Sequence, residues 1–381
     1  MKARFNFPTR ILFGEGTLSD LPGELGNLGA HRVLVVSDKG LVKAGIVDRV
    51  TEVIDAGGLE HVVYDQVSPN PTGTQVDEGA GLFRGEHCDA IIGVGGGSPM
   101  DAAKAIQLRI HHRDPLREYD DLLGGDAKVT GPLPPLVALP TTSGTGSEVS
   151  RSAVVTLEDV GRKVVIFSPR LMPSVALCDP ELTYGLPARI TAETGMDALS
   201  HNLEAYLSKG YHPMADAIAL QGIAMVGANL ARAVADGGNR EARREMMMAS
   251  TMGAVAFQKG LGVIHSLAHA LGAVAGVAHG LANAVIMPHA MRFNAAGAPE
   301  RLTAVAKALG AGDASPEGAA RAVEDLLGRI GLPGTLGQAG VSDEHFEDIV
   351  DKAMADGCHG QNPLAMTRES MATLLRTCFG G

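Results

Sequence analysis

The stretch DAIIGVGGGSPMDAAK, residues 89–104, joins a short apolar run to three successive glycines and then to an amphipathic helical pattern. A glycine-rich turn between a strand and a helix is where a backbone binds the pyrophosphate of a dinucleotide, because the helix N-terminus attracts anions. We expect Ser98 to cap the helix and Asp101 to lie in its first turn. The common dinucleotide-binding motif is GxGxxG, and here Ser98 stands where the last glycine is expected. The match is therefore incomplete, and a tight strand-to-helix turn that binds no ligand is the alternative. The predicted contacts of this turn are Gly95, Gly96, Gly97, Ser98 and Asp101.

Short apolar strands alternate with helical patterns on both sides of this turn. Strands are predicted at 32–36, 61–65, 89–94 and 135–139, and helices at 41–56, 73–86 and from residue 100 onward. Continuous apolar strands separated by helices indicate a parallel sheet with helices on both faces. Two hairpins are predicted in addition, one from residues 3–7 and 10–14 and one from residues 152–157 and 163–167.

After Pro187 the strand signals stop and the pattern becomes helical to the end of the sequence. Alanine, leucine, methionine and glutamate recur there with the period of 3.6 residues that is typical of amphipathic helices. We therefore predict two domains. Residues 1–185 form an α/β, Rossmann-like dinucleotide-binding domain built on a parallel sheet, and residues 186–381 form an all-α domain.

Composition excludes several classes of function. The 381 residues are 45% hydrophobic and 20% charged, which fits a globular protein with a large core. No apolar run of about 18 residues is evident, so no membrane segment is expected, and the N-terminus lacks the features of a signal peptide, which favours a cytoplasmic protein. The net charge of −11 without a basic block argues against nucleic-acid binding. The four cysteines are scattered, which argues against a zinc ribbon and against a disulfide framework.

Two further segments would contribute to a dinucleotide site. The loop LPTTSGTGSE, residues 139–148, follows a predicted strand and offers hydroxyl groups that suit phosphate, ribose or nicotinamide. A polar surface loop is the alternative interpretation. Asp38 follows the strand at 32–36, where a carboxylate binds ribose hydroxyls and repels a 2′-phosphate, so it favours NAD over NADP. In the common Rossmann motif the acidic residue follows the glycine turn, whereas Asp38 precedes it. The alternative role of Asp38 is therefore to cap the N-terminus of a helix.

Histidines and one aspartate recur at helical spacing in the second half. Asp197 and His201 are four residues apart, as are His265 and His269, so each pair lies on one face of a helix. His279 follows a stretch with two glycines and returns toward His265 only if the chain turns there. Imidazoles with a carboxylate suit Zn or Fe(II) and not Mg or Ca. Spacing alone does not decide which histidines bind, and a hydrogen-bonded core histidine is the alternative for each.

The chain strongly resembles the iron-containing alcohol dehydrogenases, also called group III, nearly from end to end. The matching segments are FGEG (13–16), PNPT (69–72), GVGGGSPMDAAK (93–104), PTTSGTGSEV (140–149), CDPELT (178–183), TGMDALSHNLEAY (194–206), GLGVIHSLAHALG (260–272) and AHGLANAVIMPHAM (278–291). The resemblance implies a dehydroquinate synthase-like fold with an NAD-binding α/β domain and a helical metal-binding, catalytic domain. It also implies an oxidoreductase that transfers a hydride between a small alcohol or aldehyde and NAD.

The resemblance implies roles for individual residues. The metal ligands would be Asp197, His201, His265 and His279, holding Fe(II), with Zn as the alternative. His269 matches a histidine near the nicotinamide, and we expect it to relay protons, with a packing role as the alternative. Further cofactor contacts would be Asn70, Thr141, Thr142, Ser143 and Lys163. Family members are often dimeric, so we expect a homo-oligomer.

The chain departs from common family patterns at HALG (269–272), where HPLG is usual, and at Ala278, where proline is usual. These departures leave the shape of the substrate pocket open. Phe167 and Phe257 are predicted to line that pocket, with core packing as the alternative. Lys259 is predicted to attract an anionic substrate group, with a solvated surface position as the alternative. The alternative functions are a same-fold relative, either a Zn-dependent polyol-phosphate dehydrogenase or a dehydroquinate synthase-like lyase, and a non-enzymatic NAD-binding protein.

Overall fold

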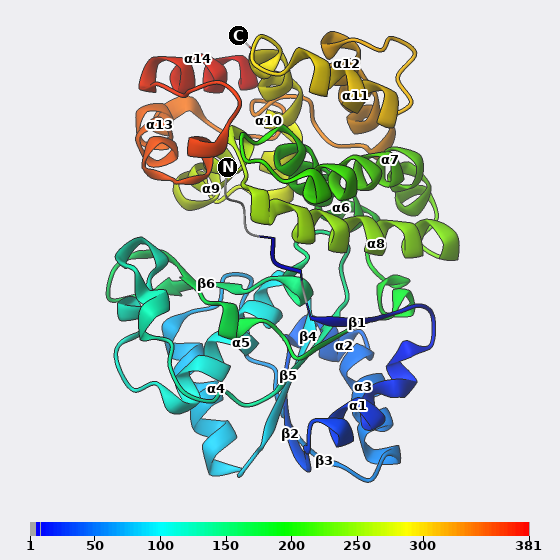
Figure 1. Ribbon diagram of the computed structural model, residues 1–381, viewed down its shortest axis with the longest axis vertical. Helices are drawn as coiled ribbons and strands as arrows, with labels where there is room; N and C mark the ends of the chain where they lie inside the picture. Colours follow the sequence, from blue (N-terminus) through cyan, green and yellow to red (C-terminus); the bar gives the residue numbers. More distant parts are fainter. Residues whose placement is uncertain (1–4, 8, 381) are drawn as a thin grey trace. The chain divides into compact units, whose positions relative to one another are not determined.

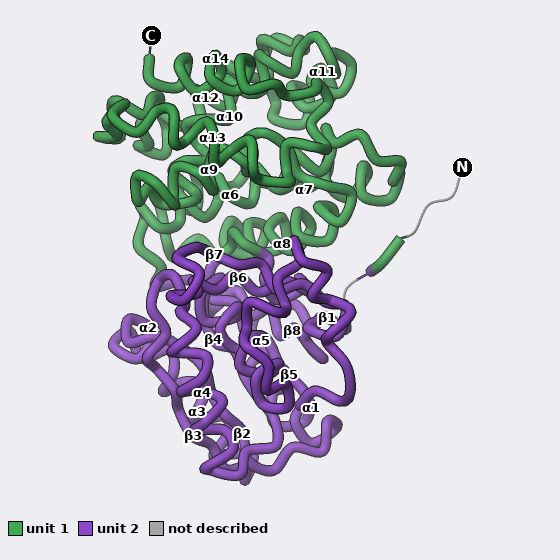
Figure 2. Tube along the Cα trace, turned by 90° about the vertical axis from the view of Figure 1, so that its left-hand side faces the viewer, with its two compact units in different colours: residues 1–6, 143–145, 186–381 green, residues 7–142, 146–185 purple. Residues whose placement is uncertain are grey.

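The computed structural model describes residues 5–7 and 9–380. These residues fold into two compact units, which Figure 2 shows in different colours. The sheet unit comprises the described part of Phe7–Thr142 together with Gly146–Gly185. The helical unit comprises the described part of Leu186–Gly381, with residues 5–6 and Ser143–Thr145. Three residues of one loop therefore pack with the helices, although the chain on either side of them belongs to the sheet unit.

The sheet unit is built on six strands that all pair in parallel (Figure 1). Their order across the sheet is β1-β8-β5-β4-β2-β3. The strands are β1 (Arg10–Phe13), β2 (Arg32–Val36), β3 (Glu60–Tyr64), β4 (Ala90–Gly95), β5 (Leu136–Pro140) and β8 (Val175–Cys178). The predicted parallel sheet is confirmed.

Helices cover both faces of this sheet. They are α1 (Leu21–Asn27), α2 (Lys39–Lys43), α3 (Ile46–Ala56), α4 (Gly73–Gly85) and α5 (Gly97–His111). In β2, Val33 and Val35 pack in the same core cluster as α1 and α3, whereas Leu34 and Val36 pack with α4 and α5. Burial on both faces explains why this strand is a continuous apolar run instead of an alternating one.

The carboxyl ends of two neighbouring strands place two predicted cofactor segments side by side. β4 and β5 are adjacent in the sheet, and Gly95 at the end of β4 pairs with Pro140 at the end of β5. The backbone N–H of Thr141 donates to Gly95 O at 3.0 Å. The glycine turn and the loop after residue 140 therefore leave the sheet together, at the edge where open α/β sheets bind ligands.

One hairpin prediction is confirmed and the other is wrong. β6 (Ser152–Leu157) and β7 (Arg162–Phe167) pair antiparallel, as predicted. Of the other predicted hairpin, residues 3 and 4 lie outside the described residues, residues 5–7 form no strand, and β1 pairs in parallel with β8 instead. The backbone hydrogen bonds of β1 are made with β8, a parallel strand far along the chain, so no local hairpin turn is needed.

Apart from small shifts at the ends of elements, two features of the sheet unit differ from the prediction. The helix predicted at 41–56 is two helices, α2 and α3, because Gly45 between them adopts φ +73. The strand β8 was not predicted, because its four residues are too few to show a period.

Helices α6 to α14 make up most of the helical unit, so its helical character is confirmed. They are α6 (Ala188–Leu207), α7 (Pro213–Ala235), α8 (Arg240–Ala256), α9 (Val263–Ala275), α10 (His279–Asn294), α11 (Pro299–Ala308), α12 (Pro316–Ile330), α13 (Phe346–Ala355) and α14 (Arg368–Cys378). α10 packs against α6, α9, α12 and α14. Most of the buried apolar residues of the unit form a single core cluster around it.

One helix of this unit is long and apolar enough to cross a membrane by length and composition alone. This helix is α7, with 23 residues. Polar and charged residues interrupt it, among them Asp216, Gln221 and Asn229, so the expectation of no continuous apolar run of about 18 residues holds. α7 packs against α6 and α8, and Ile223, Val226 and Leu230 are fully buried in the core of the unit. One face of α7 therefore belongs to the core of the unit, and 39% of its most apolar window is buried.

Candidate metal centre and cofactor loops

Two side chains of the candidate metal centre come from one face of α6. Asp197 and His201 lie four residues apart on this helix, with 3% and 7% of their surface exposed. Their neighbours Ala198, Leu199 and Leu203 are buried in the apolar core. Packing of the helix therefore fixes the direction of the carboxylate and of the imidazole.

The other two histidines are brought together by a turn between α9 and α10. α9 ends at Ala275, and Gly276 follows in the left-handed conformation with φ +66. The chain reverses direction at Gly276, which is one of the two glycines before His279, and α10 begins at His279. The ring centroids of His265 and His279 are 5.3 Å apart, whereas on one continuous helix the two residues would be about 21 Å apart.

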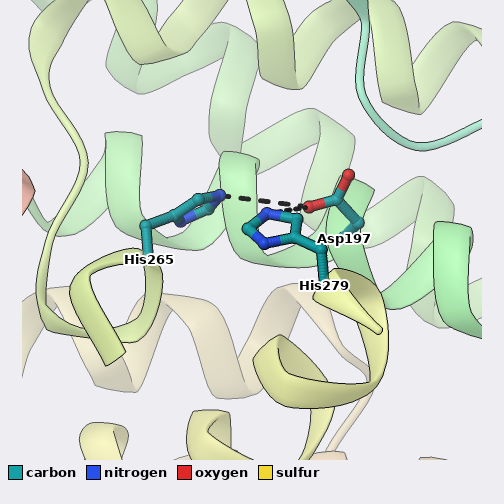
Figure 3. Close-up of side chains that lie close together, drawn as sticks. All are labelled: Asp197, His265 and His279. Atoms are coloured by element: carbon teal, nitrogen blue, oxygen red, sulfur yellow. Dashed lines mark ion pairs between the residues drawn. The ribbon is translucent and has the colours of Figure 1, made fainter. Parts of the chain in front are cut away.

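The three imidazoles converge on one carboxylate oxygen of Asp197. Its Oδ1 atom lies 3.3 Å from Nε2 of His279 and 3.9 Å from Nε2 of both His201 and His265. Figure 3 shows Asp197, His265 and His279 pointing toward one another. Ligands about 2.1 Å from a tetrahedral ion lie about 3.4 Å from one another. The ligand atoms of Asp197, His265 and His279 all lie within 4.8 Å of one another, which fits a set of metal ligands, and Nε2 of His201 lies 3.9 Å from the same Asp197 oxygen.

The other ring nitrogen of two of these histidines has a partner. Nδ1 of His201 donates to Gly144 O at 3.3 Å, and Nδ1 of His265 lies 2.6 Å from Oε2 of Glu204. A neutral imidazole with its proton on Nδ1 has a free lone pair on Nε2. Nε2 of His265 is buried and has no hydrogen-bond partner within the described part of the chain. A buried polar atom without a partner is costly, and a metal ion at this point would satisfy it.

The protonation states also fit a cation between these groups. Burial opposes the charged form of Asp197, but His201 and His279 outweigh burial and hold the pKa of this carboxyl well below its usual range. Burial lowers the pKa of His201 to about 4, although Asp197 opposes the shift, and burial also lowers the pKa of His265 well below its usual value. At neutral pH, Asp197 is a carboxylate and these two imidazoles are neutral, which are the forms that bind metal.

Two polar residues beside the centre were not predicted. Asn283 is fully buried one turn after His279, and its Nδ2 donates to Asp197 Oδ1 at 2.8 Å. Glu204 lies three residues after His201 on α6. Burial raises the pKa of Glu204 to about 7, against backbone hydrogen bonds that favour its charged form. Both residues could have been found from their spacing. Asn283 is four residues after His279 and Glu204 is three residues after His201, and residues at such spacing share a helix face.

His269 lies next to the centre and is held by a carboxylate. Its ring stacks on that of His279 at a centroid distance of 5.3 Å, and 44% of its side chain is exposed. Nδ1 of His269 lies 2.9 Å from Oδ2 of Asp356, whose Oδ1 accepts hydrogen bonds from Ser266 Oγ and from the backbone N–H of Cys358. Burial opposes the charged form of Asp356, but the hydrogen bond from His269 holds the pKa of this carboxyl below its usual range. The carboxylate therefore fixes the ring of His269.

The glycine turn and the neighbouring loop approach each other closely. Gly95 has φ +151, and a Cβ atom there would lie 2.5 Å from Cγ of Pro99, so only glycine fits. A Cβ atom on Gly96 would lie 3.2 Å from Oγ1 of Thr142. α5 begins at Gly97, and its N-cap residue, Gly96, has no side chain to cap the first N–H groups. These donors are therefore available to an anion.

Two residues of the glycine turn differ from prediction. Ser98 does not cap α5, because the helix has already begun one residue earlier; its hydroxyl donates to Pro69 O at 2.6 Å instead. Asp101 lies beyond the first turn for the same reason. Its carboxylate accepts hydrogen bonds from Ser147 Oγ at 2.7 Å and from the backbone N–H of Val154 at 3.1 Å. These contacts join α5 to the loop after β5 and to β6.

Of the remaining predicted cofactor residues, Ser143 belongs to the helical unit and the others belong to the sheet unit. Asp38 accepts a hydrogen bond from Leu41 N at 3.0 Å and caps α2, which was its alternative role. Asn70 and Lys163 are exposed, Thr141 and Ser143 are buried, and Thr142 is half-buried.

The three predicted pocket residues lie in different surroundings. The ring of Phe257 lies 5.2 Å from that of His201, so Phe257 is next to the candidate metal centre. Lys259 is not at a solvated surface; its side chain is buried, donates to Tyr206 O at 3.0 Å and pairs with Asp216. Its charge is thus already balanced, which removes the basis for attracting an anionic substrate. Phe167 is half-buried in the sheet unit.

Comparison with known proteins gives a consistent result over both units. A family model described as iron-containing alcohol dehydrogenase matches residues 8–180, and a model of the C-terminal part of the Fe-containing alcohol dehydrogenase family matches residues 191–379. A 4-hydroxybutyrate dehydrogenase of Cupriavidus necator is 44% identical over 367 residues, covering 93% of this chain and 94% of that protein. The crystal structure of a 1,3-propanediol oxidoreductase is 40% identical, with a TM-score of 0.95, covering 99% of this chain and 100% of that one. A sulfoacetaldehyde reductase from Bifidobacterium kashiwanohense, solved in complex with NAD+, is 32% identical with a TM-score of 0.88 and covers 99% of both chains.

Proposed function

Because this chain belongs to the iron-containing alcohol dehydrogenase family, we propose that it is an NAD-dependent, metal-dependent alcohol dehydrogenase and aldehyde reductase. The reaction is hydride transfer between the carbinol carbon of a small alcohol and NAD. The observation that carries the proposal is the convergence of three imidazole nitrogens on Oδ1 of Asp197, at 3.3 to 3.9 Å. A polyol-phosphate dehydrogenase or a dehydroquinate synthase-like lyase is not favoured, because both halves of the chain match models of the alcohol dehydrogenase family.

We assign the metal site to Asp197, His201, His265 and His279, with Fe(II) as the ion and Zn as the alternative. Three imidazoles and one carboxylate suit either ion. When bound, the ion would supply Lewis acidity that lowers the pKa of a substrate hydroxyl or polarises a carbonyl. The chain holds the donor atoms close together, and the apolar ring of Phe257 lies against His201 at a centroid distance of 5.2 Å.

We assign NAD binding to the sheet unit and take residues 1–185 and 186–381 as the NAD-binding and the catalytic domain. The N–H groups at the start of α5 would bind the pyrophosphate, and Asp38 would bind the adenosine ribose. Asp101 holds the loop after β5 in place. The residues proposed to contact the cofactor are Asp38, Asn70, Gly95, Gly96, Gly97, Ser98, Thr141, Thr142, Ser143 and Lys163.

We propose that His269 relays the proton of the reaction. The contact with Asp356 puts the proton of the neutral ring on Nδ1, so Nε2 is free to accept a proton from the substrate hydroxyl. The side chain is 44% exposed, so the proton can pass on to solvent.

The relatives suggest the class of substrate. Their names refer to 4-hydroxybutyrate, 1,3-propanediol and sulfoacetaldehyde, which are short molecules with a second polar group. We propose a short primary alcohol or aldehyde with a polar group at its far end. We also propose a cytoplasmic enzyme that forms a dimer, for which light scattering of the purified protein is the measurement.

The experiment is an NADH absorbance assay on metal-free protein reloaded with Fe(II) or Zn(II). A panel of short alcohols, diols, hydroxy acids and aldehydes should include substrates for the reloaded protein and none for the metal-free protein. His279→Ala should lose metal and activity together, whereas His345→Ala should keep both, because His345 is 50% exposed and contacts only Asp348 among the ion pairs of the described residues. Reloaded protein that turns over no member of the panel overturns the proposal.

A further inference from the structure

Glu204 is a buried acid to which the proposed reaction gives no role. It lies on α6 three residues after His201, and 4% of its surface is exposed. The same face of α6 therefore carries Asp197, His201 and Glu204 in successive turns. An acidic side chain is costly to bury unless its oxygens have partners.

Both oxygens of Glu204 contact the first turn of α9. Oε1 accepts a hydrogen bond from Ile264 N at 2.6 Å, and Oε2 accepts one from His265 N at 3.3 Å. Oε2 also lies 2.6 Å from Nδ1 of His265. Gly262, at the N-cap position of α9, has no side chain, so a carboxyl group from another helix takes the place of a capping residue.

The backbone around Glu204 leaves room for its carboxyl group. A Cβ atom on Gly262 would lie 2.8 Å from Oε1 of Glu204, closer than these atoms can approach. Any other residue at position 262 would therefore push the carboxyl group away from α9. Gly262 thus leaves space for the carboxyl group of Glu204, and this carboxyl group contacts the ring of His265.

We infer that Glu204 is a positioning residue that sets which nitrogen of His265 faces the metal, and this inference rests on the metal site assigned above. Oε1 and Oε2 both accept backbone hydrogen bonds, which favour the carboxylate form, and a carboxylate only accepts, so Nδ1 of His265 is the donor of the contact at 2.6 Å. Its proton on Nδ1 leaves the lone pair on Nε2, 3.9 Å from Asp197 Oδ1. Nε2 is also the buried atom that lacks a hydrogen-bond partner in the described chain.

The alternative is that Glu204 only caps α9. A cap stabilises the helix, whereas a positioning residue also changes metal affinity through His265. Carboxylates that hold a metal-binding histidine contribute about 10-fold to 100-fold to affinity. Ser315 offers a matched control, because it caps α12 in the same unit by accepting a hydrogen bond from Gly318 N at 3.0 Å.

The test measures Zn(II) affinity of the full chain by competition with a chromophoric chelator. Glu204→Gln should weaken Zn(II) binding about 10-fold to 100-fold, and Ser315→Ala should leave it unchanged. In a His265→Ala background, Glu204→Gln should have no further effect, because Glu204 acts through His265. Unchanged affinity of Glu204→Gln, or an equal loss in both backgrounds, overturns the inference. Wild-type protein that binds no Zn(II) overturns the metal site itself, which is a different result.

A second measurement needs no substitution at Glu204, in case that variant does not fold. Nitrogen-15 NMR of histidine-labelled, metal-free wild type reports which ring nitrogen of His265 carries the proton, with His265→Ala used for assignment. A proton on Nδ1 supports the inference, and a proton on Nε2 overturns it.

Discussion

Replacing Gly144 by alanine should disturb the candidate metal centre without altering any ligand. A Cβ atom at this position would lie 2.8 Å from both Cβ and the carbonyl oxygen of Thr194 on α6. Carbon atoms pack at about 3.5 Å, so the loop has to retreat by about 0.7 Å, the difference from 2.8 Å. The obstacle includes helix backbone, which does not yield as the end of a flexible side chain does.

This retreat should break one buried hydrogen bond. Nδ1 of His201 donates to Gly144 O at 3.3 Å, and a longer separation falls outside hydrogen-bonding range. An unpaired buried donor costs about 1–3 kcal/mol, and overpacking costs about 1–3 kcal/mol more. We therefore expect the free energy of unfolding of the helical unit to fall by about 2–6 kcal/mol. Zn(II) affinity should fall about tenfold, because His201 loses the partner that orients its ring.

Urea denaturation followed by circular dichroism measures the first effect, and chelator competition measures the second. The matched control is Gly81→Ala, at an exposed position of α4 where a Cβ atom meets nothing within 4 Å. It should be neutral or stabilise the protein by about 0.5–1 kcal/mol. A Gly144→Ala protein with the unfolding free energy and Zn(II) affinity of wild type would refute this steric reasoning.

Three further predictions concern other parts of the chain. Gly95→Ala should weaken NAD+ binding at least tenfold in titration calorimetry, because the new Cβ atom would lie 2.5 Å from Pro99 Cγ at φ +151; unchanged affinity would contradict the fit of the turn. His269→Gln should lower kcat about 100-fold while bound metal, measured by elemental analysis, stays constant; loss of the metal would instead indicate a ligand. Burial lowers the pKa of Lys104 to about 8, so between pH 8 and 10.5 the unfolded chain binds more protons than the folded chain. Stability of wild type relative to Lys104→Met should therefore rise with pH across this window in urea denaturation, and a constant difference would argue against a depressed pKa.

The fold was predictable where local pattern and tertiary structure agree. The run RVLVV at 32–36 is a buried central strand, and its continuous apolar character carried that information. The first strand was predicted, but its pairing was mispredicted because its partner is remote: Arg10 pairs with Val175, and no local feature of residues 10–13 indicates this. Which strand pairs with which depends on the packing of the whole sheet and not on the sequence of one strand.

For the candidate metal centre, the sequence predicted only which residues share a helix face. Spacing placed Asp197 and His201 on one helix face, but it did not distinguish His265 from His269 as a ligand. That distinction depends on which ring of α9 faces Asp197, and this follows from how α9 packs against α6 in the folded unit. Lys259 was misjudged for the same reason, because its partner Asp216 lies 43 residues away in sequence.

The candidate ligands lie on three separate helices, α6, α9 and α10; His265 comes 68 positions after Asp197, and His279 comes 14 positions after His265. An ion held between them would act as a cross-link that closes a long chain loop, as a disulfide does in secreted proteins. Newly synthesised chains that have not acquired an ion would lack this cross-link. They should therefore open more often around these helices and be cleaved faster by proteases, so that the cell would retain loaded molecules in preference to unloaded ones.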